Sequence, residues 1–208
     1  MGSALAKQMR SPSEKGCVGW MAKKIMSMGN GADSIDAVSL IKTVNSPVIV
    51  ELGPGAGYSL RKMLSDLKPS KIYGIEISDA FRKALAADDE FAASISSGVL
   101  SLHGNDATKL DFIPDNSVDI IFGFNVIYFL DPLNVYVKEM YRILKPDGQV
   151  IFGVKDIAKT METSVYINTD WKVCLDEMKS VGFVDETQGE EKLEGPLAYT
   201  LLTAKKPQ

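Results

Sequence analysis

The chain has 208 residues, 45% hydrophobic and 24% charged, which suits one globular domain with a full hydrophobic core. Its net charge of −4 argues against a broad surface for nucleic-acid phosphates, so no nucleic-acid partner is expected. No apolar run approaches the roughly 18 residues that span a bilayer. Two distant cysteines fit a cytoplasmic protein with neither a metal site nor a disulfide framework.

The first part of the chain is expected to form a helical segment of its own. Residues 16–28 and 34–44 carry apolar side chains at helical spacing, on either side of a Met28-Gly29-Asn30-Gly31 break. Strand-like sequence starts only after this segment. We therefore expect residues 1–45 to be a helical lid and residues 46–208 to be the main domain. The alternative is that these helices pack permanently on a face of the sheet.

Strand-like and helix-like segments alternate from residue 47 to about residue 154, which is typical of an α/β domain. Helices are expected at Ser59–Leu67 and Ala80–Ile95. A third helix is expected to begin with Pro132 and to end at Lys145-Pro146-Asp147-Gly148. Most strand-like segments are apolar on both faces, as parallel strands between helices should be. The expected strands are Val48–Leu52, Lys71–Glu76, Val99–His103, Val118–Phe124 and Gln149–Val154.

The pattern changes after residue 155. A helix is expected at Thr169–Val181, ended by Gly182 and followed by short strands at Phe183–Thr187 and Ala198–Ala204. The connection between these two strands is too short for a crossover helix. We therefore expect an antiparallel hairpin that closes the sheet.

Residues 48–59 read VIVELGPGAGYS, a buried strand followed by glycines at alternate positions. Glycines there let the backbone turn sharply toward a ligand, and the next helix offers unpaired N–H groups. A purely structural strand-to-helix turn is the alternative. Glu76 ends the second strand, where an acid can accept hydrogen bonds from ribose hydroxyls. The GxGxG spacing departs, however, from the GxGxxG of nicotinamide sites.

Several segments together carry a family resemblance. ELGPGAG, residues 51–57, resembles the E/DxGxGxG motif of class I S-adenosylmethionine-dependent methyltransferases, and GIEIS, residues 74–78, resembles their second motif. HGNDATKLDFIPDNSVDIIFGFNVIYFLDP, residues 103–132, is similar to the third and fourth motifs, and EMYRILKPDGQVIFG to the strand-five segment. The resemblance points to the small-molecule, methyltransferase domain 11-like type.

What the resemblance implies is a Rossmann-like, seven-stranded, mostly parallel sheet with helices on both faces and an antiparallel last strand. The implied cofactor is S-adenosyl-L-methionine. Glu51 would lie under the glycine loop near the methionine end, and Glu76 would hold both ribose hydroxyls. Asp106 would accept a hydrogen bond from the adenine amino group. The implied cofactor set is Glu51, Gly53, Gly55, Gly57, Glu76, Ile77, Asp106, Ala107 and Asn125.

Structural alternatives exist for these residues. Glu76 could cap a helix, Asp106 could cap the turn before Leu110, and Asn125 could make a structural hydrogen bond. His103, the only histidine, ends an apolar strand, so it is not assigned a catalytic role. The candidates for the acceptor pocket are Trp20, Met28, Asn30, Tyr128 and Tyr166, and core packing is the alternative for Tyr128.

A sulfonium methyl group is already activated by its positive charge, so we expect in-line displacement, catalysed mainly by proximity and orientation. The catalytic residues stay unassigned, because no convincing general base is found. The short chain and the pI of about 5.1 favour a small-molecule acceptor. The rival interpretations are a nicotinamide-dependent oxidoreductase and a non-catalytic S-adenosylmethionine-binding protein. The acceptor atom and the oligomeric state stay open.

Overall fold

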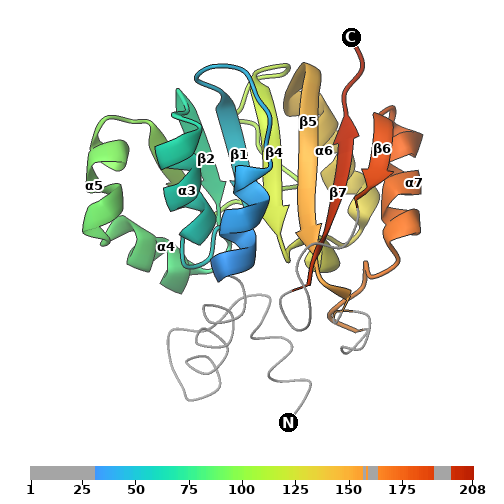
Figure 1. The fold of residues 1–208 in the computed structure, drawn as a ribbon, viewed down its shortest axis with the longest axis horizontal. Coiled ribbons are helices and arrows are strands. Elements are labelled where there is room, and N and C mark those ends of the chain that lie inside the picture. Colours follow the sequence, from blue (N-terminus) through green and yellow to red (C-terminus); the bar gives the residue numbers. More distant parts are fainter. Residues whose placement is uncertain (1–30, 157, 159–163, 190–197) are drawn as a thin grey trace.

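The computed structural model describes residues 31–156, 158, 164–189 and 198–208, and these form a seven-stranded sheet flanked by helices (Figure 1). The strand order is β3-β2-β1-β4-β5-β7-β6. β7 is antiparallel to both of its neighbours, and the other pairings are parallel. The predicted fold class is therefore confirmed. The strands are β1 (Val48–Leu52), β2 (Lys71–Ile75), β3 (Leu100–His103), β4 (Val118–Phe124), β5 (Leu144–Val154), β6 (Val184–Gln188) and β7 (Thr200–Lys205).

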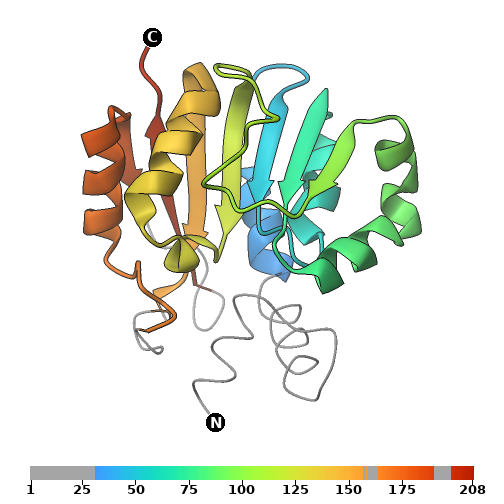
Figure 2. The ribbon, with the colours of Figure 1, turned by 180° about the vertical axis from the view of Figure 1, so that it is seen from behind.

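Helices cover both faces of the sheet. A helix at residues 31–39 and α3 (Tyr58–Asp66) lie on the face turned to the viewer in Figure 1. The opposite face, in front in Figure 2, carries α6 (Leu133–Ile143) and α7 (Trp171–Val181). Beyond the β3 edge lie α4 (Asp79–Ala86) and α5 (Asp89–Ser96), and the short η1 (Ile127–Phe129) follows β4. None of the helices in the described ranges is long and apolar enough to cross a membrane.

Two hydrophobic clusters lie on the two faces, because side chains alternate along each strand. On β5, Phe152 joins the cluster under α6 and α7, while Ile151 joins the cluster under α3. On β1, Val50 and Ile49 divide in the same way. The sheet is thus buried on both faces where the parallel strands run, which explains why their sequences are apolar almost throughout.

Residues 31–41 belong to the core. Ala37 and Val38 are fully buried and pack in the same cluster as α3. The Tyr199 hydroxyl donates to Asp36 Oδ2 at 2.6 Å, and the fully buried Asp33 pairs with Lys155 at the end of β5. In this structure residues 31–41 therefore pack on the sheet, as in the alternative to a lid. The lid expectation is left with residues 1–30, which lie outside the described ranges.

Several of the expected element boundaries are wrong, most clearly in the segment 80–95 and around α6 and β5. Instead of one helix at Ala80–Ile95 there are two, because Asp88 accepts a hydrogen bond from the Glu90 N–H and caps a new helix. Pro132 has an extended ψ of 131° and is the N-cap of α6, not its first helical residue. α6 ends at Ile143, and β5 begins at Leu144, which pairs with Val118.

Candidate cofactor site

An open cleft of about 1060 Å³, part of it bulk solvent, lies at the carboxyl ends of the central strands. It sits where the strand order reverses between β1 and β4, the position at which open α/β sheets bind ligands. Four segments meet there, each following a different strand. They contribute residues 52–56 after β1, 75–77 after β2, 106–107 after β3, and 124–126 after β4.

The glycine loop forms one wall of the cleft. Gly53 donates its N–H to Ile75 O at 2.8 Å, and Gly55 donates to Glu76 Oε2 at 3.0 Å, so the loop is tied to the end of β2. Gly53 and Gly55 line the cleft as expected, but Gly57 does not. A Cβ on Gly57 would lie 2.6 Å from Leu85 and 2.8 Å from Phe91, and its φ is +80°. Gly57 is therefore required by the turn and by helix packing.

Glu76 lines the cleft although it is only 5% exposed. Its two carboxylate oxygens accept from Gly55 N and from Ser78 N, at 3.0 and 2.8 Å. Burial raises the pKa of Glu76, and these hydrogen bonds oppose that rise. The N-cap of α4 is Ser78, so Glu76 is not the capping residue of that helix. Since a carboxylate oxygen has two lone pairs, both oxygens can still accept from a ligand.

Glu51 lies behind the loop and does not line the cleft itself. One oxygen accepts from the hydroxyl of Ser59, which does line the cleft. The other oxygen, Oε2, is buried with no hydrogen-bond partner among the described residues. Burial raises the pKa of Glu51 to about 8; the Ser59 hydrogen bond opposes this, and the nearby Glu76 adds to it. A buried oxygen without a partner is energetically costly, and it can still accept a hydrogen bond from a ligand or a water molecule.

The segment after β3 forms the far end of the cleft. Asp106 and Ala107 line it, and so does Ile77, which is 41% exposed. Asp106 Oδ1 accepts from Thr108 N at 3.0 Å, and Oδ2 accepts from the Tyr136 hydroxyl at 3.1 Å. The bond to Thr108 is the turn-capping interaction considered as the alternative. The turn orients Asp106 in the wall of the cleft, so capping of the turn and contact with a ligand are compatible roles for this residue.

Of the residues predicted near the methyl acceptor, some line the cleft and others do not. Asn125 lines the cleft, but its Oδ1 accepts from the Tyr128 hydroxyl at 2.8 Å, the structural hydrogen bond considered for it. Tyr128 and Tyr166 are 2% and 7% exposed and pack against each other, and neither lines the cleft. For these tyrosines core packing is observed. The candidates Trp20, Met28 and Asn30 lie outside the described residues.

Sequence reasoning missed several residues that reach the cleft. Phe129 follows the expected Tyr128 directly, and the 3₁₀ turn of η1 decides which of the two rings faces inward. Tyr136 comes from α6, where helical spacing gives no sign of a ligand role. His103 does not line the cleft; its ring stacks on Phe112 with centroids 4.2 Å apart. The other missed lining residues are Ser34, Leu52, Pro54, Ala56, Tyr58, Ser59, Ile75, Phe81, Phe124, Val126 and Leu130.

This fold, with a glycine loop after β1 and acids after β2 and β3, defines a class I S-adenosylmethionine-dependent methyltransferase, the class whose cofactor is S-adenosyl-L-methionine. Residues 50–152 match the model of the family described as methyltransferase domain, and the chain belongs to that family.

Known proteins support this assignment. A malonyl-[acyl-carrier protein] O-methyltransferase from Marinomonas sp. (strain MWYL1) is 28% identical over 122 residues, which cover 56% of this chain. The match spans only 41% of that relative. Phosphoethanolamine N-methyltransferase 2 from Haemonchus contortus, solved with phosphomonomethylethanolamine and S-adenosylhomocysteine, has a TM-score of 0.72 at 15% identity, covering 98% of this chain and 61% of its own.

A putative methyltransferase solved in complex with the Haloferax volcanii Trm112 methyltransferase activator has a TM-score of 0.69 at 18% identity. The likeness covers 89% of this chain and 94% of that one. At these identities, the likeness to both solved structures shows the shared fold.

Proposed function

We propose that the protein transfers the methyl group of S-adenosyl-L-methionine to a small-molecule acceptor. The observation that carries the proposal is the order of groups along one cleft. The glycine loop and Glu76 lie at the ends of neighbouring strands, and Asp106 lies beyond them at the end of the next strand. This order suits the methionine, ribose and adenine parts of the cofactor.

The groups in the cleft fit the polar atoms of that cofactor. Glu76 would accept hydrogen bonds from both ribose hydroxyls, a task that needs two acceptor oxygens on one side chain. Asp106 would accept from the adenine amino group, beside Ala107. Glu51 would order the loop from behind, and a water molecule would link its unsatisfied Oε2 to the cofactor ammonium. Asn125 would contribute polar contacts near the methionine part.

The chain's own contribution to the reaction is positioning. When bound, the cofactor supplies a methyl group activated by the sulfonium charge, for in-line displacement by the acceptor. Holding the two reactants in line lowers the entropic part of the barrier. The end of the cleft where the methionine part would lie has an apolar wall formed by Phe124, Val126 and Phe129. This wall would keep water away from the reacting atoms. No general base is assigned.

Small acceptors are supported by the relatives, one of which carries phosphomonomethylethanolamine in its structure. The relatives' names include both an O-methyltransferase and an N-methyltransferase, so the acceptor atom must be found by experiment. One similar chain is solved in complex with an activator protein, so a partner protein of this kind is a further binding partner to test for.

Two measurements test the proposal. Calorimetry should show micromolar binding of S-adenosylhomocysteine and far weaker binding of NAD. A metabolite extract incubated with labelled S-adenosylmethionine should yield a methylated product that mass spectrometry can identify. NAD bound as tightly as S-adenosylhomocysteine would contradict the proposal and favour an oxidoreductase. Cofactor binding without any labelled product across such extracts would favour a non-catalytic binding protein.

A further inference from the structure

We infer that α6 holds the adenine-binding loop in place through three side chains, Tyr136, Glu139 and Arg142, which we call the α6 brace. In this role the three are positioning residues for cofactor recognition. The inference rests on the proposed function, because it assumes that Asp106 accepts a hydrogen bond from the adenine.

The loop in question, residues 104–117, needs such support. It joins β3 to β4 without forming a helix or a strand of its own. Its backbone N–H and C=O groups therefore require partners outside regular secondary structure. Leu110 and Ile113 are 1% and 0% exposed and anchor the loop in the hydrophobic core.

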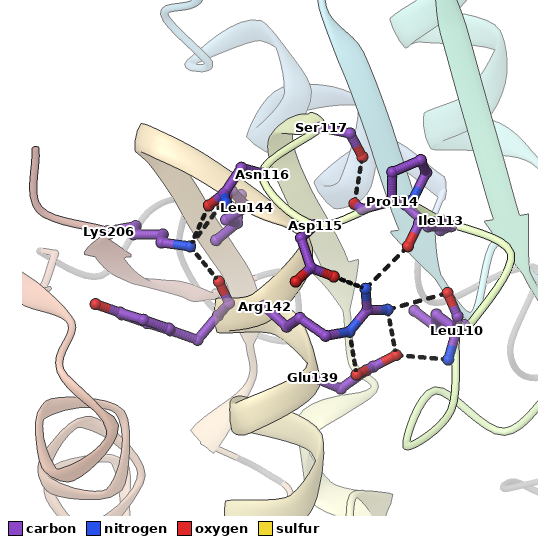
Figure 3. Close-up of polar contacts among 11 residues, drawn as sticks. Leu110, Ile113, Pro114, Asp115, Asn116, Ser117, Glu139, Arg142, Leu144 and Lys206 are labelled. Atoms are coloured by element: carbon purple, nitrogen blue, oxygen red, sulfur yellow. Dashed lines mark hydrogen bonds and ion pairs between the residues drawn. The ribbon is translucent and has the colours of Figure 1, made fainter.

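Arg142 and Glu139 supply partners to this loop (Figure 3), in addition to the loop's own bond from Ile113 N to Leu110 O at 2.8 Å. The Arg142 guanidinium donates to Leu110 O at 3.1 Å and to Ile113 O at 3.0 Å. It also donates two hydrogen bonds to Glu139, at 2.8 and 2.9 Å, and one to Asp115. Glu139 Oε1 in turn accepts from Leu110 N at 2.6 Å. Both backbone groups of Leu110 are thereby bound to α6. The Arg142 guanidinium is a planar fork of donors, which a lysine ammonium could not reproduce.

Asp106 is fixed from the same helix. Tyr136 donates its hydroxyl to Asp106 Oδ2 at 3.1 Å. The turn that follows is closed by bonds from Thr108 N to Asp106 Oδ1 and from Lys109 N to Asp106 O, at 3.0 and 3.1 Å. Asp106 is thus held directly by Tyr136 and, through a turn four residues long, by the anchored Leu110.

The spacing and the charges of the brace fit this role. Tyr136, Glu139 and Arg142 are three residues apart, so they follow one another along one side of α6. The hydrogen bonds from Arg142 lower the pKa of Glu139, so the pair is ionised at neutral pH. A loop already ordered in the free protein does not have to be ordered when the cofactor binds, and that favours affinity.

The test measures base preference, because a merely structural role would not change it. Two probes are compared by calorimetry: S-adenosylhomocysteine and S-inosylhomocysteine, whose base has a carbonyl oxygen where adenine has its amino group. A hydrogen bond to a charged group predicts that the wild-type protein prefers the adenine compound at least about tenfold. In Arg142→Lys and Tyr136→Phe, we expect this preference to fall below about threefold, with inosine-compound affinity unchanged within about twofold.

Lys206→Met is the matched control. Lys206 Nζ binds the carboxyl end of α6 through Tyr141 O and Leu144 O, at 2.8 and 3.0 Å, and also binds Asn116 (Figure 3). Tyr141 and Leu144 lie outside the loop, and Asn116 lies at the β4 end of the loop, ten residues along the chain from Asp106. We therefore expect this variant to lower the melting temperature while keeping the wild-type base preference.

The outcomes are distinct. A wild-type preference retained in both Arg142→Lys and Tyr136→Phe would overturn the brace, as would an equal loss of preference in Lys206→Met. If Arg142→Lys does not fold, Glu139→Gln takes its place, because it keeps the side-chain shape and, unlike Tyr136, Glu139 does not line the cleft. Failure of the wild-type protein to bind S-adenosylhomocysteine would instead contradict the proposed function. Tight binding of both compounds without preference would refute the Asp106 assignment and the brace, but not the methyltransferase proposal.

Discussion

At the scale of single residues, Glu76 has an observed structural role beside the binding role proposed for it. Its carboxylate joins the glycine loop to the start of α4 through Gly55 and Ser78, and it faces the cleft. Because each hydrogen bond to an ionised group contributes about 1.5–3 kcal/mol, losing the two ribose contacts in Glu76→Ala should weaken cofactor binding at least about tenfold. Calorimetry with S-adenosylhomocysteine measures the change.

The control for this prediction is Asp176→Ala. Asp176 forms an exposed ion pair with Lys172 on α7, and its side chain is 60% exposed. This variant should bind the cofactor as the wild-type protein does, since exposed pairs of this kind contribute little to stability. If Glu76→Ala also kept wild-type affinity while remaining folded, Glu76 would have only its structural role.

At the scale of the element, the helix at residues 31–39 distinguishes core packing from lid behaviour. Ile41, just beyond it, is 9% exposed and belongs to the cluster under α3, whereas Ile35 is 37% exposed. Ile41→Ala should lower the free energy of unfolding by about 2–5 kcal/mol, as large-to-small core substitutions do. Ile35→Ala should change it by no more than about 0.5 kcal/mol. Urea denaturation measures both.

The two isoleucines carry the same substitution, so a difference of several kcal/mol between them reports burial, because the helix propensity of Ala at Ile35 changes the free energy by only a few tenths of a kcal/mol. Equal, small losses in both variants would mean that this segment detaches readily from the sheet, as a lid does. The large difference we expect would identify residues 31–41 as a fixed part of the domain.

At the scale of the whole molecule, the buried carboxyl of Glu51 predicts that stability depends on pH. Burial raises its pKa from 4.5 to about 8, so the folded protein binds more protons than the unfolded chain between these values. The free energy of unfolding should therefore fall as pH rises from about 4.5 to about 8, by on the order of 5 kcal/mol, and then level off.

Denaturation with urea at several pH values measures this dependence. Glu51→Gln keeps the shape of the side chain and cannot titrate, so its stability should vary less with pH. Part of the slope should persist in this variant, because burial raises the pKa of Glu76 in the same direction. An identical pH dependence in the variant and the wild-type protein would show that Glu51 is ionised in the folded state.

Much of the fold and the cofactor loop could be predicted from the sequence because they depend on neighbouring residues. Strand-like segments that are apolar on both faces predicted β1 and β4 at their observed bounds. The break between α4 and α5 was not predicted, because it depends on a single capping bond from Glu90 N to Asp88, which competes with helix continuation at a similar energy.

The sequence by itself determined the strand pattern, the glycine turn and the class of protein, because periodicity and motif order are written in local stretches of chain. Only the tertiary structure decided that Gly57 faces Leu85 and Phe91, that Phe129 lines the cleft and Tyr128 does not, and that residues 31–41 pack on the sheet. It alone also joined Arg142 to Leu110. These contacts link residues distant in the chain, and close packing in the core selects them, which no local pattern specifies.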